Sequence, residues 1–252
     1  MPGVALVRRP TPDLAEGIVT HIERVPVDVE LASKQHDGYC AALQDAGWRL
    51  EEVRPAPGLP DAVFVEDTVV VVGSTAVITR SGAPQRRPET EGTEDVVRRL
   101  GLDVVHLTGD ATMDGGDVLQ VGSTVYVGRG GRTNAEGIRQ LRAVVEPLGR
   151  IVVPVRLQDV LHLKSAVTAL PDGTVLALPE LLEPGVFAAT RPVHEEEGCH
   201  VVPTGPGEVL ISASAPRTAE SLTDLGFTVR TVDVTEFEKL EGCVTCLSVL
   251  IG

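Results

Sequence analysis

The 252-residue chain is long enough to bury a core as one compact domain or as two small ones. Its formal charge of −14, with one tryptophan, two tyrosines and four phenylalanines, argues against nucleic acid as a partner and suits a small cationic substrate better. The longest apolar runs are strand-sized and far short of the ~20 residues of a membrane span, so we expect no membrane partner.

The chain contains repeated strand patterns. The segments DTVVVVGSTAVITR (67–80) and GDVLQVGSTVYVGR (116–129) match each other, and each places β-branched runs on both sides of a Gly-Ser-Thr turn. This pattern predicts two β-hairpins. Looser copies lie at 165–178 and 200–212, and a fifth hairpin would join the two ends of the chain, CVTCLSVLI with GVALVRR.

Segments with helical caps and periodicity lie between the hairpins. They are expected at Val29 to Gly47, after Thr93, after Thr133-Asn134 with a stop at Gly149, and after Thr218. Hairpin, helix and further strand thus recur about five times, and repeat units of this size must pack on their neighbours to bury their apolar faces. The sequence predicts a single α/β domain over residues 1–252, built as a closed ring around a central site. A doubly wound sheet is the alternative, but the chain lacks a G-x-G-x-x-G loop after a strand.

Polar residues recur at one point of the repeat, just before each hairpin. Glu66 and Asp67 precede the first, Asp114 the second, His162 the third and Cys246 the last, in steps of 48, 48 and 84 residues from Glu66. Each residue alone has an ordinary structural explanation, such as a turn aspartate or a small buried cysteine. Their common phase instead predicts that they meet at the ring axis.

These residue types can perform nucleophilic chemistry. A thiol with an ordinary pKa of about 8.5 needs a cation or an imidazole nearby to ionise at neutral pH, and His162 supplies acid–base capacity if Asp114 fixes its tautomer. A cysteine peptidase uses the same trio, but Glu66 and Asp67 would then raise the pKa of the thiol. A substrate guanidinium resolves this conflict, because it binds carboxylates through its forked donors and its charge favours the thiolate.

The motifs FVEDT, ITRSGAPQRRPE, MDGGDVL, RTN, LHLKS and TCLSVLI together resemble the dimethylarginine dimethylaminohydrolases of the guanidino-modifying pentein superfamily. The resemblance spans nearly the whole chain. It implies a five-fold pseudosymmetric α/β propeller, in agreement with the repeats. It also implies hydrolysis of N-omega-methylated arginines to citrulline and dimethylamine or methylamine.

The resemblance further implies a role for each matching residue. Cys246 is expected to attack the guanidinium carbon and form a covalent thiouronium. His162 is expected to protonate the departing amine and then to deprotonate the attacking water, while Asp114 orients it. Glu66 and Asp67 are expected to hold the guanidinium.

Four further positions match the substrate-binding residues of that family. Arg86 and Arg132 are expected to bind the substrate α-carboxylate, and neither has a charge partner in its own motif. Asp61 is expected to contact the substrate. The loop from Asp13 to Ile18 is expected to form a lid over the site.

One position distinguishes this chain from the arginine deiminases of the same superfamily. Arginine deiminases usually have His-x-Asp where this chain has Lys164, and losing that acceptor suits a methylated nitrogen. Arginine deimination therefore ranks second, and amidino transfer, usually by a longer chain, ranks third. A binding protein for cationic amino acids would lack the nucleophile or the histidine, and both are present.

The cysteines allow other interpretations. A redox pair of Cys243 and Cys246 should open a helix, yet a strand pattern follows. A zinc site of these cysteines with His162 lacks a second ligand pair, so we expect no metal or other cofactor. Cys40 and Cys199 are interpreted as structural, although Cys199 and His200 could line the pocket. Four cysteines without a framework or a leader pattern favour a cytoplasmic location, and a homodimer is the expected assembly.

Overall fold

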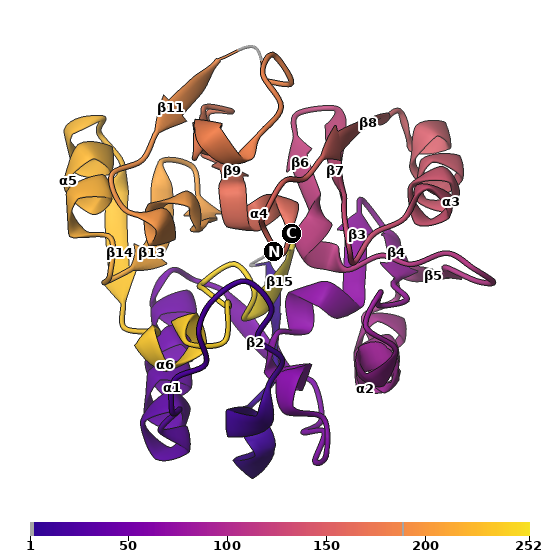
Figure 1. Cartoon of the computed structure of the whole chain (residues 1–252), viewed down its shortest axis with the longest axis horizontal. Coiled ribbons are helices and arrows are strands. Elements are labelled where there is room, and N and C mark those ends of the chain that lie inside the picture. Colours follow the sequence, from indigo (N-terminus) through magenta and orange to yellow (C-terminus); the bar gives the residue numbers. More distant parts are fainter. Residues whose placement is uncertain (1–2, 188) are drawn as a thin grey trace.

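Five three-stranded sheets surround a common centre, with the two chain ends meeting near it (Figure 1). The computed structural model describes residues 3–187 and 189–252. Each sheet combines an antiparallel hairpin with a third, parallel strand. The sheets are β15 (Ser248–Ile251), β1 (Val4–Val7) and β2 (Arg49–Glu52); β3 (Val69–Val72), β4 (Thr75–Ile78) and β5 (Asp103–His106); β6 (Val118–Val121), β7 (Thr124–Arg129) and β8 (Ile151–Arg156); β9 (Val167–Ala169), β10 (Val175–Ala177) and β11 (Thr190–Pro192); and β12 (Val201–Gly205), β13 (Glu208–Ser212) and β14 (Thr228–Val232).

All five predicted hairpins are confirmed, including the one made from the two chain ends. In that hairpin Val4 pairs with Ile251, which closes the ring. The Gly-Ser turns of β3–β4 and β6–β7 place Gly73 at φ 59° and Gly122 at φ 57°. Two-residue hairpin turns need such positive φ values, and glycine adopts them without steric cost. The resulting architecture is the α/β propeller that the repeats predicted.

The longer helices connect the second and third strands of four sheets. They are α1 (Val29–Asp45), α2 (Thr90–Arg99), α3 (Ala135–Val145) and α5 (Pro216–Asp224), with shorter turns α4 (Leu163–Ala166) and α6 (Thr235–Glu238). The unit of β9 to β11 is shortened, and among the described residues between its second and third strands the one helical element is the 3-10 turn η7 (Pro179–Leu181). Asn134 caps α3 as predicted, accepting a hydrogen bond from the Gly137 amide at 2.8 Å.

Two predicted helix starts were wrong by a few residues. Helix α2 begins at Thr90 rather than after Thr93, because the Thr93 hydroxyl is buried against Thr68 at 2.9 Å instead of capping the helix. Helix α5 begins at Pro216, a residue suited to a first helical position, and Thr218 lies inside it.

The core lies mainly between neighbouring sheets, as expected for repeats that cannot bury their own apolar faces. One cluster joins Val70 and Val77 of the second sheet with Val118 and Val127 of the third, beneath Leu141 of α3. A search of the described residues found no helix with the length and hydropathy of a transmembrane span.

Candidate active site

The segments that precede four of the hairpins converge at the centre of the ring. Asp67 lies in η3 (Val65–Thr68), Asp114 precedes η5 (Gly115–Asp117), His162 precedes α4, and Cys246 lies in the turn before β15. Nε2 of His162 lies 3.1 Å from Oδ2 of Asp114 and 3.9 Å from Oδ1 of Asp67. Asp114 and His162 therefore meet as the phase of the repeats predicted, whereas the third group at this point is Asp67 and not Glu66, from which the phase was counted.

Seven of the nine predicted site residues line one small cavity at this centre. They are Ile18, Asp61, Asp67, Arg86, Arg132, His162 and Cys246, and the sequence did not single out the other lining residues, Phe64, Leu161, Leu240, Glu241 and Gly242. The cavity has a volume of about 20 Å³. Because one water needs roughly 10–15 Å³, the structure is a closed form with no room for an amino acid.

His162 and Asp114 form a buried ion pair. Burial lowers the pKa of His162, but Asp67, the hydrogen bond to Asp114 and the charge of Asp117 together raise it to about 9. Burial raises the pKa of Asp114, but His162 and Arg86 outweigh this and hold it well below its usual range. In the closed cavity at neutral pH, His162 is therefore a protonated acid that donates to an ionised carboxylate.

The two glycines of MDGGD allow the catalytic segments to approach each other. A Cβ on Gly115 would lie 2.0 Å from the carbonyl oxygen of Glu66, and one on Gly116 would lie 2.7 Å from Nδ1 of His162. The Gly116 amide also donates a 2.9 Å hydrogen bond to Oδ1 of Asp67. Glycine at these positions thus permits the close contact of Asp67 and His162.

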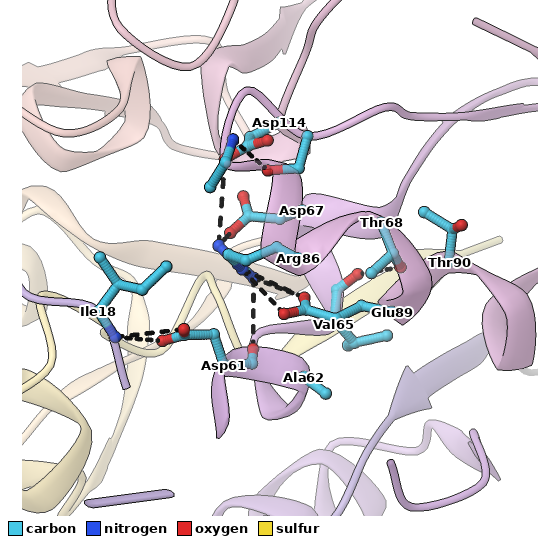
Figure 2. A network of polar contacts seen from close by, with 12 residues as sticks. Ile18, Asp61, Ala62, Val65, Asp67, Thr68, Arg86, Glu89, Thr90 and Asp114 are labelled. Carbon is cyan, nitrogen blue, oxygen red and sulfur yellow. Dashed lines mark hydrogen bonds and ion pairs between the residues drawn. The ribbon is translucent and has the colours of Figure 1, made fainter. Parts of the chain in front are cut away.

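Arg86 lies at the centre of a buried charge network (Figure 2). Its Nη1 donates to Oδ2 of Asp67 at 2.9 Å, and its Nε and Nη2 donate to Glu89 at 2.9 to 3.2 Å. Burial lowers the pKa of Arg86, but Glu89 and Asp67 raise it well above its usual value. Arg132 donates in the same way to Oδ2 of Asp114 at 3.2 Å. The two arginines that the sequence left without partners are therefore both paired with acids.

Two carboxylates fasten the 17–21 segment over the cavity. The Ile18 amide donates to both oxygens of Asp61, at 3.1 and 3.2 Å (Figure 2). The amides of Thr20 and His21 donate to Glu241 at 2.5 and 2.9 Å. Glu241 itself adopts φ 59°, a left-handed conformation that is uncommon outside glycine. The predicted loop from Asp13 differs in its first part, which is the 3-10 helix η1 (Pro12–Glu16).

Glu66 lies apart from the other predicted guanidinium ligand. It lines a second cavity of about 250 Å³ together with Lys164 and Thr245, whereas Asp67 lines the small one. Nζ of Lys164 donates to Oε1 of Glu66 at 2.5 Å. Burial raises the pKa of Glu66 and Lys164 opposes this rise, which leaves the pKa at about 7. Lys164, which departs from the arginine deiminase pattern, therefore neutralises Glu66.

The sulfur of Cys246 contacts polar groups of the turn in which it lies. Sγ accepts a hydrogen bond from the Cys243 amide at 3.5 Å and lies 3.8 Å from the Thr245 hydroxyl. Burial raises the pKa of Cys246, and the charges of Glu66 and Asp67 add to the rise, which together bring the pKa to about 12. In the closed cavity Cys246 is therefore a neutral thiol.

The other cysteines occupy structural positions. Cys243 is a free thiol buried in the core, and burial holds its pKa well above the usual range. Cys199 is buried and donates to the Ala166 carbonyl at 3.3 Å. Over the described residues, one group could place three metal ligands within 4.8 Å, namely Asp67, Asp114 and His162. Arg86 and Arg132 already supply positive charge to its carboxylates.

Comparison with known proteins agrees with the resemblance read from the motifs. The family model described as arginine deiminase matches residues 49–201. The N(G),N(G)-dimethylarginine dimethylaminohydrolase of Streptomyces coelicolor is 59% identical over 97% of this chain and 95% of its own length. The enzyme of the same name from Pseudomonas aeruginosa is 36% identical over 96% of this chain and 97% of its own length.

Solved structures of the same family also match the fold. A dimethylarginine dimethylaminohydrolase histidine-to-glycine variant, an adduct with S-methyl-L-thiocitrulline, superposes with a TM-score of 0.91 at 33% identity. A cysteine-to-serine variant of the Pseudomonas aeruginosa enzyme, in complex with citrulline, gives a TM-score of 0.90, and both matches cover 100% of both chains. The chain belongs to the dimethylarginine dimethylaminohydrolase family.

Proposed function

We propose that this protein hydrolyses N-omega-methylated arginines, releasing L-citrulline and dimethylamine or methylamine. The observation that carries the proposal is that Cys246, His162 and Asp67 line one cavity with two arginines. A thiol, an imidazolium and a carboxylate beside two guanidinium groups suit an amino acid that has a cationic guanidinium at one end and a carboxylate at the other. The 59% identity to a named dimethylarginine dimethylaminohydrolase supports the same substrate class.

The substrate would enter by exchanging ion-pair partners. In the closed site Asp67 faces Arg86, and Asp114 faces Arg132. The α-carboxylate of the substrate binds the two arginines, and its guanidinium binds Asp67, so that each charged group keeps an opposite charge nearby. Asp61 contacts the substrate from beneath the 17–21 segment. Glu66 contributes negative charge from the neighbouring cavity, and its ion pair with Lys164 reduces that charge.

The 17–21 segment must move before a substrate can reach Cys246, since the closed cavity has a volume of only about 20 Å³. We therefore name residues 17–21 the lid. Its closure would exclude water from the site while the covalent intermediate forms.

In the first half-reaction the thiolate of Cys246 attacks the guanidinium carbon. Binding of the cationic substrate opposes the charges of Glu66 and Asp67 and favours loss of the thiol proton to solvent. The new bond joins Sγ to carbon, and the bond from carbon to the methylated nitrogen breaks. Protonated His162 gives its proton to that nitrogen, so dimethylamine leaves as a neutral amine and a cationic thiouronium remains on Cys246.

In the second half-reaction His162, now neutral, removes a proton from a water that attacks the same carbon. The carbon–sulfur bond then breaks, the thiolate leaves, and the remaining hydroxyl proton passes to the released amine through solvent. The sum is one methylated arginine and one water converted to citrulline and an alkylammonium. Asp114 keeps His162 oriented in both halves through the 3.1 Å hydrogen bond. The site draws on segments that precede four of the five hairpins, which supports one catalytic domain over residues 1–252.

Arginine deimination is the second candidate, favoured by the family model that matches residues 49–201. The experiment that decides is a citrulline assay with asymmetric dimethylarginine, monomethylarginine and arginine, using the native chain, Cys246→Ser and His162→Ala. We expect citrulline from the methylated substrates, with both variants at least 100-fold slower, on the order of the effect of losing a nucleophile or general acid. Faster release from arginine would favour the deiminase, and no citrulline from any substrate would refute the hydrolase.

A further inference from the structure

We propose that His200 is a positioning residue for the nucleophile, acting through the Thr245 hydroxyl on the sulfur of Cys246. The inference rests on the proposed role of Cys246 and adds two residues to it. His200 follows η8 (Glu196–Cys199) and directly precedes β12, whereas Thr245 lies in the turn before β15. Residues from two repeats of the ring therefore lie close to the reactive sulfur.

The geometry places the three groups in a row. Nδ1 of His200 lies 3.1 Å from Oγ1 of Thr245, and that oxygen lies 3.8 Å from Sγ of Cys246. His200 and Thr245 are both buried. The second donor to Sγ, the Cys243 amide at 3.5 Å, is fixed by the backbone. Thr245 is thus the rotatable donor of the pair.

His200 determines whether that donor is available. A threonine hydroxyl has one proton, which can point to the imidazole or to the sulfur but not to both. If Nδ1 of His200 carries a proton and donates it to Oγ1, the hydroxyl proton is free to point at Sγ. We assign this tautomer to the working enzyme.

His200 is neutral in its surroundings. Burial lowers its pKa, and the positive charges of Lys164 and His162 add to this effect, which together bring the pKa to about 4. On another side His200 lines a cavity of about 540 Å³ with the carboxylates of Glu196, Glu197 and Glu238. Further titratable groups on that cavity are Asp159, His21, Glu241 and Cys243. A neutral imidazole carries one ring proton, so a single tautomer decides the direction of the hydrogen bond.

The thiolate needs such a donor at two steps. It must form beside Glu66 and Asp67 before the attack, and it must leave the carbon when water has added. Hydrogen bonds to an ionised acceptor are roughly twice as strong as those between neutral groups. A hydroxyl directed at Sγ would therefore stabilise the thiolate more than the thiol in both half-reactions.

The test is a double-mutant cycle in the full chain, with Thr245→Val, His200→Leu and the double variant. The pH dependence of iodoacetamide labelling at Cys246, read by peptide mass, gives the apparent pKa of that thiol without turnover. We expect each single variant to raise this pKa and to lower kcat for asymmetric dimethylarginine about tenfold, with KM changed less than about twofold. The double variant should be no worse than either single one, because the two residues act in series.

Conservative variants separate positioning from packing. Thr245→Ser keeps the hydroxyl, and His200→Asn places an amide where Nδ1 stood, so both should regain most of the lost rate. An unchanged labelling profile in Thr245→Val, or additive losses in the double variant, would overturn the relay. So would a His200→Asn variant that folds as stably as the native chain yet stays as slow as His200→Leu.

A spectroscopic measurement covers the case in which a His200 variant does not fold. Imidazole ¹⁵N shifts of the native chain should show the His200 proton on Nδ1, and a proton on Nε2 alone would contradict the assignment. The labelling profile remains informative even if the native chain releases no citrulline. Failure of the proposed function and failure of the relay are therefore distinguishable.

Discussion

Nε2 of His162 lies 3.1 Å from Oδ2 of Asp114, although the two residues are 48 positions apart in the chain. The ion pair is buried, so it links the protonation of the proposed general acid to the stability of the ring. The pKa of His162 is raised to about 9 and that of Asp114 is held well below its usual range.

The free energy of unfolding should depend on pH through this pair. A histidine with a raised pKa binds its proton more tightly in the folded state, so its contribution is complete below about pH 6.5 and is lost as the pH rises to about 9. The native chain should lose about 1.4 kcal/mol per pH unit in that window relative to His162→Gln. Urea unfolding at pH 6 and pH 9.5 measures this. Parallel pH profiles for both chains would contradict the raised pKa.

Asp67→Asn should change ionisation of the nucleophile and turnover in opposite directions. Asp67 is one of the charges that raise the pKa of Cys246, so its removal should shift iodoacetamide labelling of Cys246 to lower pH. The same change removes a proposed guanidinium ligand and should lower kcat/KM for asymmetric dimethylarginine by about 100-fold or more. Glu220→Ala, an exposed change on α5, is the control. Labelling at unchanged pH in Asp67→Asn would contradict the electrostatic account.

Lys164→Met should destabilise the protein far more than the double change Lys164→Met with Glu66→Gln. The single variant leaves the carboxylate of Glu66 buried without its 2.5 Å partner. Breaking a buried pair in this way costs about 3–5 kcal/mol, whereas replacing both charges is often nearly neutral. Urea unfolding near pH 8 compares the two. If the double variant were as unstable as the single one, the unpaired carboxylate of Glu66 would not be the cause of the instability.

Glu241→Ala should loosen the lid without unfolding the ring. Glu241 accepts hydrogen bonds from the Thr20 and His21 amides, and its loss leaves the lid held at Gly17 and Ile18 by Arg24 and Asp61. Amide exchange at Thr20 and His21 should become about tenfold faster or more, in line with the loss of hydrogen bonds to a charged acceptor. A bulky thiol reagent should also label Cys246 faster. Glu220→Ala should leave both rates unchanged, and equal rates in Glu241→Ala would show that Glu241 does not hold the lid.

The ring and most of the site were predictable because local patterns determine them. β-branched runs around Gly73 and Gly122 identified the hairpins, and a constant spacing of 48 residues placed Glu66, Asp114 and His162 in equivalent positions, with Asp67 next to Glu66. In a ring of equivalent units, equal phase along the chain becomes proximity at the axis. The same spacing explains why residues so far apart in sequence line one cavity.

Side-chain direction and long-range charge pairing were not predictable in the same way. Glu66 and Asp67 are neighbours in η3 but line different cavities, and Glu66 is directed by Lys164, 98 residues away. The partners of Arg86 and the contact between Glu241 and the lid likewise depend on the folded ring. Helix starts at Thr90 and Pro216 shifted because threonines read as caps were used elsewhere. The expected homodimer stays a prediction.

The most direct test of the central claim is the mass of the Cys246 peptide after rapid acid quench of enzyme turning over asymmetric dimethylarginine. We expect a thiouronium adduct on Cys246, formed with loss of dimethylamine, and no adduct at this position in Cys246→Ser. An adduct on another residue, or undiminished citrulline release by Cys246→Ser, would contradict attack by this sulfur.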